Sequence, residues 1–405
     1  MKTTVEPAWE ALFRYAAEQS PFYRELFRGW KSVPRLADVP TVDKQALSER
    51  NADFLCVPRD QVAEIVTTSG TTGQPLLWML TEADLQRLAC NEQQSFACVG
   101  LTARDTVLVA VTMDRCFIAG LAYWSGLQKI GCAAVRVGMA SPVMVLEMIA
   151  RVQPTAIVSV PSFLRLVAAT ARERGFDLAG APVEKIICIG EPIRDVTLAL
   201  NAAGREIEAA WGARVYATYG VTELANSFCE CGAGAGGHVH ADMLYVEVLD
   251  DAGQPVADGE VGEVVATTFG VEAMPLIRYR TGDCAALDNA PCVCGRTTPR
   301  VGPIVGRKHH KLKVKGVSVF PSALAAVLED AMGVESFVVM ARSDGGLADS
   351  VEVLVHGPAA LAGLREAFQG RTKIVPQIRQ AAREEIEALQ MPPQARKRRW
   401  FVDLR

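Results

Sequence analysis

Between residues 106 and 217, short runs of apolar and β-branched residues alternate with longer stretches in which apolar residues recur at helical spacing. This pattern predicts a parallel, doubly wound sheet with helices on both faces. In such a sheet, ligands bind beyond the carboxyl ends of the strands. The predicted strands are Thr106–Thr112, Ala133–Val137, Ala156–Val160, Glu184–Ile189 and Arg214–Ala217, and the predicted helices are Ala119–Ile130, Pro142–Val152, Ser162–Arg174 and Asp195–Trp211.

The pattern changes on either side of this region. Residues 6–30 predict a pair of helices broken at Pro21, and a further helix is expected to begin near Thr81. The segments Leu244–Leu249 and Gly262–Thr268 are joined by turn residues, which predicts an antiparallel, β-rich subdomain.

Residues 280–300 are rich in glycine, proline and cysteine and carry little periodicity, and a smaller unit follows Gly306. We therefore expect an α/β protein. Its large N-terminal domain, residues 1–306, would hold doubly wound mixed sheets and the β-rich subdomain, and residues 307–405 would form a small, mobile α+β domain. In the small domain, the expected strands are Lys311–Val314, Ser336–Ala341, Val351–Val355 and Trp400–Asp403, and the expected helices are Ser322–Met332, Ala359–Phe368 and Val375–Ala388.

Composition narrows the class of protein. Of the 405 residues, 50% are hydrophobic and 22% charged, which is typical of a soluble globular protein of two or three domains. The formal net charge of -4 argues against nucleic acid as a partner. We see no apolar run long enough for a membrane span and no secretory signal, and the eleven scattered cysteines fit a reducing compartment. A cytoplasmic protein is expected.

The candidate chemistry begins with the loop Thr67–Pro75, sequence TTSGTTGQP, directly behind the apolar pair Ile65-Val66. A loop of this kind suits phosphate, because Gly70 and Gly73 let the backbone approach a ligand while amides and hydroxyls donate hydrogen bonds. It is not a Walker loop, since no Gly-Lys-Ser/Thr follows at the required spacing. Taken alone, the same composition is also typical of a surface turn.

Four later segments combine glycine with charged residues at strand ends or in loops, where a doubly wound sheet binds its ligand. Each of them alone is ordinary turn chemistry. The segments are Gly190-Glu191-Pro192, Tyr219-Gly220-Val221-Thr222-Glu223 behind the strand expected to end near Ala217, Arg278–Asp283, and Gly306-Arg307.

In this order, the segments resemble those of the adenylate-forming ligases, and within them the phenylacetate-CoA ligase branch. The resemblance rests on TTSGTTGQP, YGVTE, PLIRYRTGD, CVCGR and GRKHHKLKVKGVSVFP, and it extends to SPFYR and VDK near the N-terminus. It implies an enzyme that uses ATP and Mg²⁺ to activate a carboxylic acid, most readily an aromatic one, as the acyl-adenylate with release of pyrophosphate. Transfer to a thiol, coenzyme A in that branch, would follow.

The resemblance also implies roles for individual residues. Attack on the α-phosphate requires hydrogen-bond donors for the phosphates, a metal ligand, a ribose clamp and a cation. Glu223 is the expected Mg²⁺ ligand, and Asp283 would accept the ribose hydroxyls with Arg307 as a second partner. The other expected ATP-binding residues are Ser69, Gly70, Thr71, Thr72, Gly73, Gly190, Glu191, Pro192, Tyr219 stacked on adenine, Gly220 and Thr222; Thr71 and Glu223 are also expected to be catalytic.

For Glu223 and Asp283, an ordinary structural role is the alternative. Glu223 would then be a neighbour of a helix cap and Asp283 a turn residue. The ordered set of motifs favours the functional interpretation.

The expected cation is Lys397, because the family places a catalytic lysine in a Gly-Lys pair near the C-terminus. A solvated basic tail is the alternative. The sequence departs from the family pattern at three places: Arg396 replaces the glycine of that pair, Gln74 replaces a lysine of the phosphate loop, and Lys308-His309-His310 replace the acidic hinge on which the small domain swivels. Lys308 or His309 could still serve as the hinge, since a hinge needs only to absorb a dihedral change.

Soft metal ligands gather in two loops, Cys229–His240 and Cys292–Cys294. Some members of the branch carry a structural zinc site, and matching the segments selects Cys231, His238, Cys292 and Cys294. Three thiolates and one imidazole form a closed tetrahedral site. The alternative is two unrelated pairs of reduced thiols.

The sequence leaves the acyl acceptor open. A carrier-protein thiol or an amine could replace coenzyme A, and a non-catalytic nucleotide-binding homologue is a third interpretation, supported by Gln74 and the unusual hinge. A homodimer is also compatible with the sequence. The acid pocket is expected to be lined by Met113–Trp124, Ser159–Phe163, Ile189-Gly190 and Ala217–Tyr219.

Overall fold

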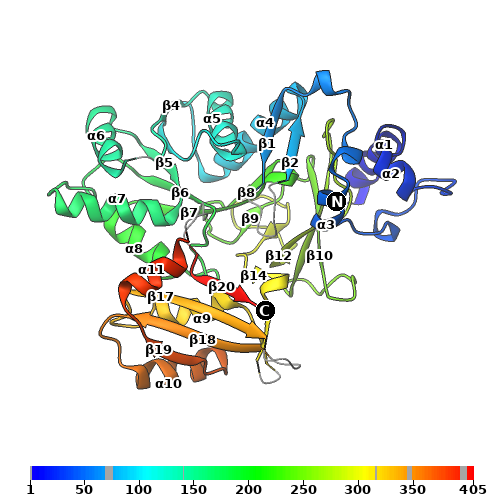
Figure 1. Ribbon diagram of the computed structural model, residues 1–405. Coiled ribbons are helices and arrows are strands. Elements are labelled where there is room, and N and C mark those ends of the chain that lie inside the picture. Colours follow the sequence, from blue (N-terminus) through cyan, green and yellow to red (C-terminus); the bar gives the residue numbers. More distant parts are fainter. Residues whose placement is uncertain (1, 69–75, 140, 315–316, 344–348, 393–398) are drawn as a thin grey trace. The chain divides into compact units, whose positions relative to one another are not determined.

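The computed structural model describes residues 2–68, 76–139, 141–314, 317–343, 349–392 and 399–405. Contacts divide the chain into two compact units, Met1–Pro303 and Ile304–Arg405, and each unit is described by itself. The predicted α/β fold with several sheets is confirmed (Figure 1). The swivelling of a domain beginning at residue 307 stays a prediction.

The first unit is built around a sheet with the strand order β4–β3–β5–β6–β7–β8. Neighbouring strands are parallel except at the edge, where β8 pairs antiparallel with β7. The strands are β3 (Thr106–Ala110), β4 (Ala133–Arg136), β5 (Ala156–Ser159), β6 (Lys185–Ile189), β7 (Arg214–Val221) and β8 (Asn226–Cys229).

Helices cover both faces of this sheet, as the sequence pattern predicts (Figure 1). Alternate residues of one strand enter different cores: Leu108 packs against α6, α7 and α8, whereas Val107 and Val109 pack against α4 and α5. Burial of both faces explains why the strands are nearly continuous apolar runs. The helices are α4 (Glu82–Val99), α5 (Ile118–Ile130), α6 (Pro142–Val152), α7 (Pro161–Glu173) and α8 (Ala202–Trp211).

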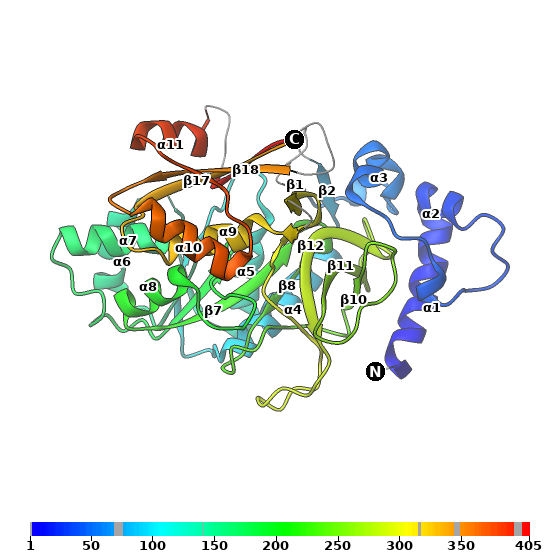
Figure 2. The same cartoon turned by 90° about the horizontal axis from the view of Figure 1, so that it is seen from below.

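A second sheet of the first unit has the strand order β10–β11–β12–β13–β9, and its strands pair antiparallel (Figure 2). It is the expected β-rich subdomain. Its strands are β9 (Gly237–His238), β10 (Leu244–Leu249), β11 (Val261–Thr268), β12 (Tyr279–Asp288) and β13 (Arg300–Val301); the hairpin β1 (Glu64–Thr67) and β2 (Leu77–Leu80) and the helices α1 (Lys2–Gln19), α2 (Pro21–Leu26) and α3 (Lys44–Glu49) complete the unit.

The second unit contains a sheet with the order β19–β18–β17–β20, in which only β17 and β18 are antiparallel. Its apolar core lies between this sheet, α9 and α10. The elements are β14 (Gly306–Arg307), β15 (Leu312–Val314), β16 (Val317–Val319), α9 (Pro321–Glu329), β17 (Ser336–Ser343), β18 (Asp349–His356), α10 (Leu361–Thr372), β19 (Gln377–Gln380), α11 (Arg383–Gln390) and β20 (Phe401–Leu404).

Three sequence expectations are wrong in detail. The helix expected from Asp195 begins only at Ala202, because Asn201 caps it by accepting a hydrogen bond from the Gly204 amide at 2.9 Å. Strand β12 occupies residues 279–288, where little periodicity was found, and the β11–β12 register shifts between Glu263 and Val265. The helix expected over residues 375–388 is instead β19 followed by α11.

Among the described residues, no helix combines the length and the hydrophobicity that a bilayer span requires.

A network of buried polar side chains joins α4 to β8. The Ser227 hydroxyl donates to Glu92 Oε2 at 2.8 Å, and the Ser227 amide donates to Asn91 Oδ1 at 2.7 Å. Ser95 Oγ lies 3.0 Å from both Ser227 Oγ and His240 Nε2. Burial raises the pKa of Glu92 to about 8, although the hydrogen bond from Ser227 opposes this shift. The carboxyl group is therefore protonated at neutral pH.

This pKa shift predicts a pH dependence of stability. Below the ordinary pKa of 4.5, Glu92 is protonated in both the folded and the unfolded chain, and between 4.5 and about 8 only the folded chain keeps the proton. The free energy of unfolding therefore falls as pH rises through this window, by about 1.4 kcal/mol per pH unit, and the loss is complete above it. Glu92→Gln stays neutral and should remove this contribution.

Thermal melts from about pH 5 to about pH 8 measure the effect. The Tm of Glu92→Gln relative to that of the natural protein should rise steadily across this range. Glu82→Gln, on the same helix but exposed, is the control and should show no such trend. The other titratable groups facing Glu92 are Tyr123, Cys229 and, through the two serines, His240, and they are unchanged in the variant. A constant Tm difference would contradict the shift.

Candidate active site

The ends of the predicted phosphate loop are held together by the β1–β2 hairpin. Thr67 pairs with Leu77, and the Thr68 amide donates to the Leu76 carbonyl at 3.0 Å. The Thr68 side chain is buried, and its hydroxyl has no hydrogen-bond partner among the described residues. The loop residues Ser69, Gly70, Thr71, Thr72 and Gly73 lie outside the described part of the chain, as does Lys397, so their roles stay predictions.

The backbone beside this hairpin is strained. Arg115 and Cys116 both have positive φ, 58° and 55°, a region that costs energy for residues other than glycine. The Cys116 carbonyl accepts a hydrogen bond from the Thr67 amide at 2.9 Å. The segment that leads into α5 is therefore tied to the start of the phosphate loop.

Strands β7 and β12 come from different sheets and meet through Tyr219 and Asp283. The Tyr219 hydroxyl donates to Asp283 Oδ2 at 2.9 Å, and the Phe228 ring stacks on the tyrosine at 5.7 Å. Burial, followed by the Asp283 carboxylate, raises the pKa of Tyr219 well above its ordinary value, so the phenol keeps its proton. Asp283 lies within β12, at the irregular segment where the register with β11 shifts, and its role stays a prediction.

Glu223 follows β7 in the short 3₁₀ turn Thr222–Leu224 and is buried. Its Oε1 lies 3.2 Å from Lys44 Nζ and accepts a hydrogen bond from the Tyr279 hydroxyl at 3.4 Å. The pKa of Tyr279 is raised by burial first and then by the charges of Glu223 and Asp283. The two predicted carboxylates therefore lie in one cluster, although they are 60 positions apart in sequence.

Sequence reasoning gave Lys44 and Tyr279 no role. Val42 pairs with β12: its amide donates to the Arg278 carbonyl at 3.0 Å, and its carbonyl accepts from the Arg280 amide at 2.7 Å. Asp43 then caps α3, whose first residue is Lys44. The run VDK contains this capping signal, but the sequence does not show that Val42 joins β12.

The predicted residues Gly190, Glu191 and Pro192 form the turn that follows β6. Glu191 accepts hydrogen bonds from the Ser162 amide at 2.8 Å and hydroxyl at 2.6 Å, so it caps the N-terminus of α7. Gly190 has a left-handed φ of 74°, and the Pro192 carbonyl accepts from the Asn201 side chain at 2.9 Å. This turn is well anchored, but its place in a base pocket stays a prediction.

Strand β7 runs to Val221, beyond its expected end near Ala217. Tyr219 and Gly220 therefore lie within the strand, and Thr222 begins the turn that follows it. Arg307 lies in β14, near the start of the second unit, and its contact with ribose also stays a prediction.

The four predicted zinc ligands, Cys231, His238, Cys292 and Cys294, are brought together: their ligand atoms all lie within 4.8 Å of one another. The sulfurs of Cys231 and Cys292 are 3.7 Å apart, and Cys294 Sγ is 3.5 Å from His238 Nε2. The other ring nitrogen of the histidine lies 3.3 Å from Thr298 Oγ1. These residues form one cluster and not two separate thiol pairs.

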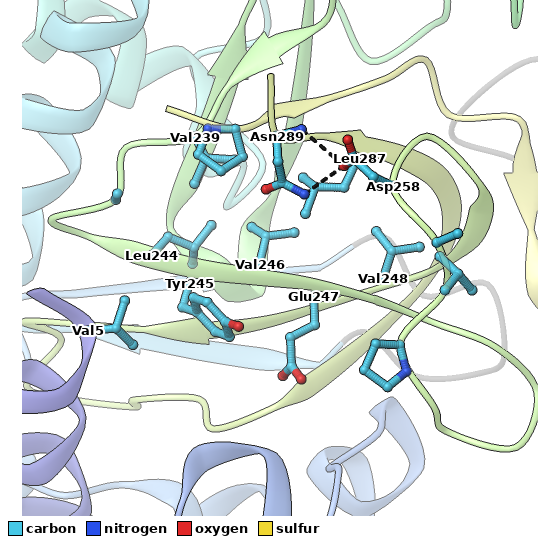
Figure 3. A pocket seen from close by; sticks show the side chains of 15 residues that line it. Val5, Val239, Leu244, Tyr245, Val246, Glu247, Val248, Asp258, Leu287 and Asn289 are labelled. Carbon is cyan, nitrogen blue, oxygen red and sulfur yellow. Dashed lines mark hydrogen bonds between the residues drawn. The ribbon is translucent and has the colours of Figure 1, made fainter. Parts of the chain in front are cut away.

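A pocket of about 230 Å³ lies elsewhere in the first unit, lined by residues of β10 together with Val5 of α1, Val239 and Leu287 (Figure 3). Apolar side chains such as Leu244, Val246 and Val248 line much of it. None of the described candidate residues lies on its wall.

Comparison with known proteins decides the family. Residues 24–272 match the model of the AMP-binding enzyme family, which is more than half of the chain. The chain belongs to this family. It is 31% identical to the phenylacetate-coenzyme A ligase of Thermus thermophilus over 346 residues, 81% of this chain and 75% of that protein. It is 30% identical to the corresponding ligase of Escherichia coli over 324 residues, 77% of this chain and 72% of that protein.

The fold is also shared with a solved structure. A 2-hydroxyisobutyryl-CoA ligase in its postadenylation state superposes with a TM-score of 0.84 at 22% identity, covering 98% of this chain and 88% of that one. The resemblance to the phenylacetate-CoA ligase branch is thus confirmed. This AMP-binding enzyme is an acid–thiol ligase of the AMP-forming type.

For an AMP-binding enzyme, the cluster around β7 and β12 offers useful chemistry. Carboxylate oxygens accept hydrogen bonds from ribose hydroxyls and coordinate hard cations. An aromatic ring of the kind that Tyr219 presents can stack on a purine. Lys44 balances the charge of Glu223, and its side chain is 34% exposed.

Proposed function

We propose that this AMP-binding enzyme activates an aromatic carboxylic acid with ATP, releases pyrophosphate and transfers the acyl group to coenzyme A. The observation that carries the proposal is the single cluster of Glu223 and Asp283, held by Tyr279 and Tyr219. In a chain of this family, these two carboxylates are the groups expected to face the metal and the ribose of one nucleotide.

In this proposal, Asp283 holds the ribose and Tyr219 supports the adenine. Glu223 would hold Mg²⁺, which neutralises phosphate charge when it is bound. Lys44 pairs with Glu223, its Nζ lying 3.2 Å from Oε1. Phosphate donors come from the loop between β1 and β2, whose two ends lie side by side in the hairpin.

The acid is placed against the start of α5. Tyr123 of this helix is buried, and the Phe96 ring of α4 packs on it at 5.7 Å. The strained pair Arg115-Cys116 lies at the entrance to the same segment. Strain of this kind clusters at active sites.

The test is ATP–pyrophosphate exchange with a panel of aromatic acids, followed by coenzyme A consumption with the acids that support exchange. We expect both activities with the same acid. Exchange without consumption would assign the acyl group to a carrier protein or an amine. No exchange with any acid would contradict the proposed ligase function and would support a non-catalytic nucleotide-binding homologue.

Lys397 is assigned to the adenylation step, where its charge would stabilise the carboxylate and the α-phosphate. Lys397→Ala should slow pyrophosphate release about 100-fold or more, because a charge that acts mainly in the transition state is lost. ATP affinity, measured by calorimetry, should change little. Arg398→Ala removes a neighbouring charge of the same basic run and is the matched control. Unchanged pyrophosphate release in Lys397→Ala would remove this lysine from the chemistry.

We also propose that the Cys231, His238, Cys292 and Cys294 cluster holds a structural zinc ion. Three thiols and one imidazole are the donor set of a closed tetrahedral site, and their spacing is compatible with one ion. Zinc would tie the loop after β8 to the loop between β12 and β13.

Metal analysis of the purified protein should find about one zinc per chain. Cys292→Ser should lose the metal and lower the Tm, because a structural zinc site contributes folding free energy. Cys90→Ser changes a cysteine outside the cluster and should retain zinc. A natural protein with no zinc near this ratio would refute the assignment.

A further inference from the structure

Glu223 uses one of its two carboxylate oxygens for protein contacts and leaves the other open. Lys44 Nζ lies 3.2 Å from Oε1, and the Tyr279 hydroxyl donates to the same oxygen at 3.4 Å. Within the described ranges, no hydrogen bond or ion pair reaches Oε2. The residue as a whole is only 6% exposed. A nearly buried carboxylate with one open oxygen can still accept a further partner.

The turn that carries Glu223 is held in place. The Ala225 amide donates to the Thr222 carbonyl at 3.0 Å, and Ala225 has a left-handed φ of 46°. Arg87 of α4 donates to the Ala225 carbonyl at 3.2 Å. A positive φ costs energy at a residue other than glycine, so these contacts maintain a backbone conformation that is unfavourable by itself. The backbone that presents the Glu223 carboxylate is therefore fixed.

Lys44 is the movable partner in this ion pair. It is the first residue of α3, directly behind the Asp43 cap, and its side chain is 34% exposed. A lysine carries its ammonium group on a flexible stem of four carbons, and this group is strongly hydrated in water. The ammonium group can therefore leave Glu223 while the helix stays in place.

The surroundings of the ion pair are acidic. Burial is the main cause of the raised pKa of Tyr279, and the carboxylates of Glu223, Asp283 and Asp43 add to it. In the part of the chain that the structure describes, Lys44 is the one lysine or arginine that pairs with Glu223. Without its charge, several neighbouring carboxylates would repel one another and attract a divalent cation.

We propose that Lys44 occupies the position of the divalent cation in the nucleotide-free enzyme and keeps Glu223 from binding this cation alone. The inference rests on the proposed function, in which Glu223 holds Mg²⁺, and adds the residue that regulates this site. Lys44 releases Glu223 when the phosphates of ATP arrive with the cation, because the phosphates supply further oxygen ligands. Metal and nucleotide then enter together.

The regulation follows from competition for one carboxylate. An ammonium group and a divalent cation repel each other strongly when both lie against the same oxygen in a site shielded from water. The free energy of the Lys44–Glu223 ion pair is therefore subtracted from the binding free energy of a cation that arrives without ATP. A neutral side chain at position 44 removes this competition.

The experiment measures Mn²⁺ binding to the protein without nucleotide or acid, from the electron paramagnetic resonance signal of free Mn²⁺. Mn²⁺ prefers the same oxygen ligands as Mg²⁺. Lys44→Met removes the charge and keeps a long side chain, and its Kd for Mn²⁺ should be lower than that of the natural protein by about tenfold or more. Lys44→Gln is the second neutral variant and guards against poor folding of Lys44→Met. Lys44→Arg keeps the charge and should bind Mn²⁺ weakly.

Two further variants locate the effect. Lys31→Met removes an exposed lysine that does not pair with Glu223, and it should bind Mn²⁺ like the natural protein. Adding Glu223→Gln to Lys44→Met should abolish the gain, because the amide offers the cation no charged oxygen. Thermal melts give a second readout: Mg²⁺ alone should raise the Tm of Lys44→Met more than that of the natural protein.

The outcomes are distinguishable. Tighter Mn²⁺ binding in Lys44→Met and Lys44→Gln that is lost in the double variant supports the proposal. An unchanged Kd in both neutral variants, a gain that Lys44→Arg shares, or a gain that survives Glu223→Gln would overturn it. None of these results bears on the ligase function, because ATP–pyrophosphate exchange by the natural protein tests that function separately.

Discussion

The candidate active site depends on two tyrosine–carboxylate hydrogen bonds that connect strands from different sheets. Strand β7 supplies Tyr219 to Asp283 of β12, and β12 supplies Tyr279 to Glu223, which follows β7. Two carboxylates brought close in a half-buried site repel each other. Two phenol donors and the Lys44 ammonium group offset this repulsion in the free enzyme. A nucleotide and its metal would replace part of that support with their own charge and hydroxyl groups.

Helix α4 connects this site to the rest of the first unit. Thr81 and Asp84 cap its N-terminus reciprocally. Arg87 then donates to the carbonyl of Ala225 and to the side chain of Asn226, directly behind the Glu223 turn. Further along α4, Glu92 accepts a hydrogen bond from Ser227 of β8. Near the end of the helix, Cys98 packs against the candidate zinc cluster. One helix therefore contacts the segment behind the Glu223 turn, strand β8 and the candidate zinc cluster.

Much of the fold could be predicted from the sequence, because the central strands and helices are marked by local hydrophobic periodicity. Helix α6 begins and ends at the predicted residues, Pro142 and Val152. Strand β19 was missed although Ile374, Pro376 and Ile378 are buried at alternate positions, the period of a strand and not of a helix. The hydrogen bonds that connect β7 and β12 could not be predicted from the local sequence pattern. Glu223 and Asp283 were found by residue type and motif, whereas Lys44 and Tyr279 reach the site through the long-range pairing of Val42 with β12.

Tyr219 of β7 contacts Asp283 of β12, and this pair of strands is assigned to the nucleotide. A crystal structure with a non-hydrolysable acyl-adenylate analogue tests this assignment most directly. The ribose should contact Asp283, and the phosphate group should lie beside Glu223. An analogue bound with Glu223 and Asp283 facing different cavities would contradict the single site on which the proposed function rests.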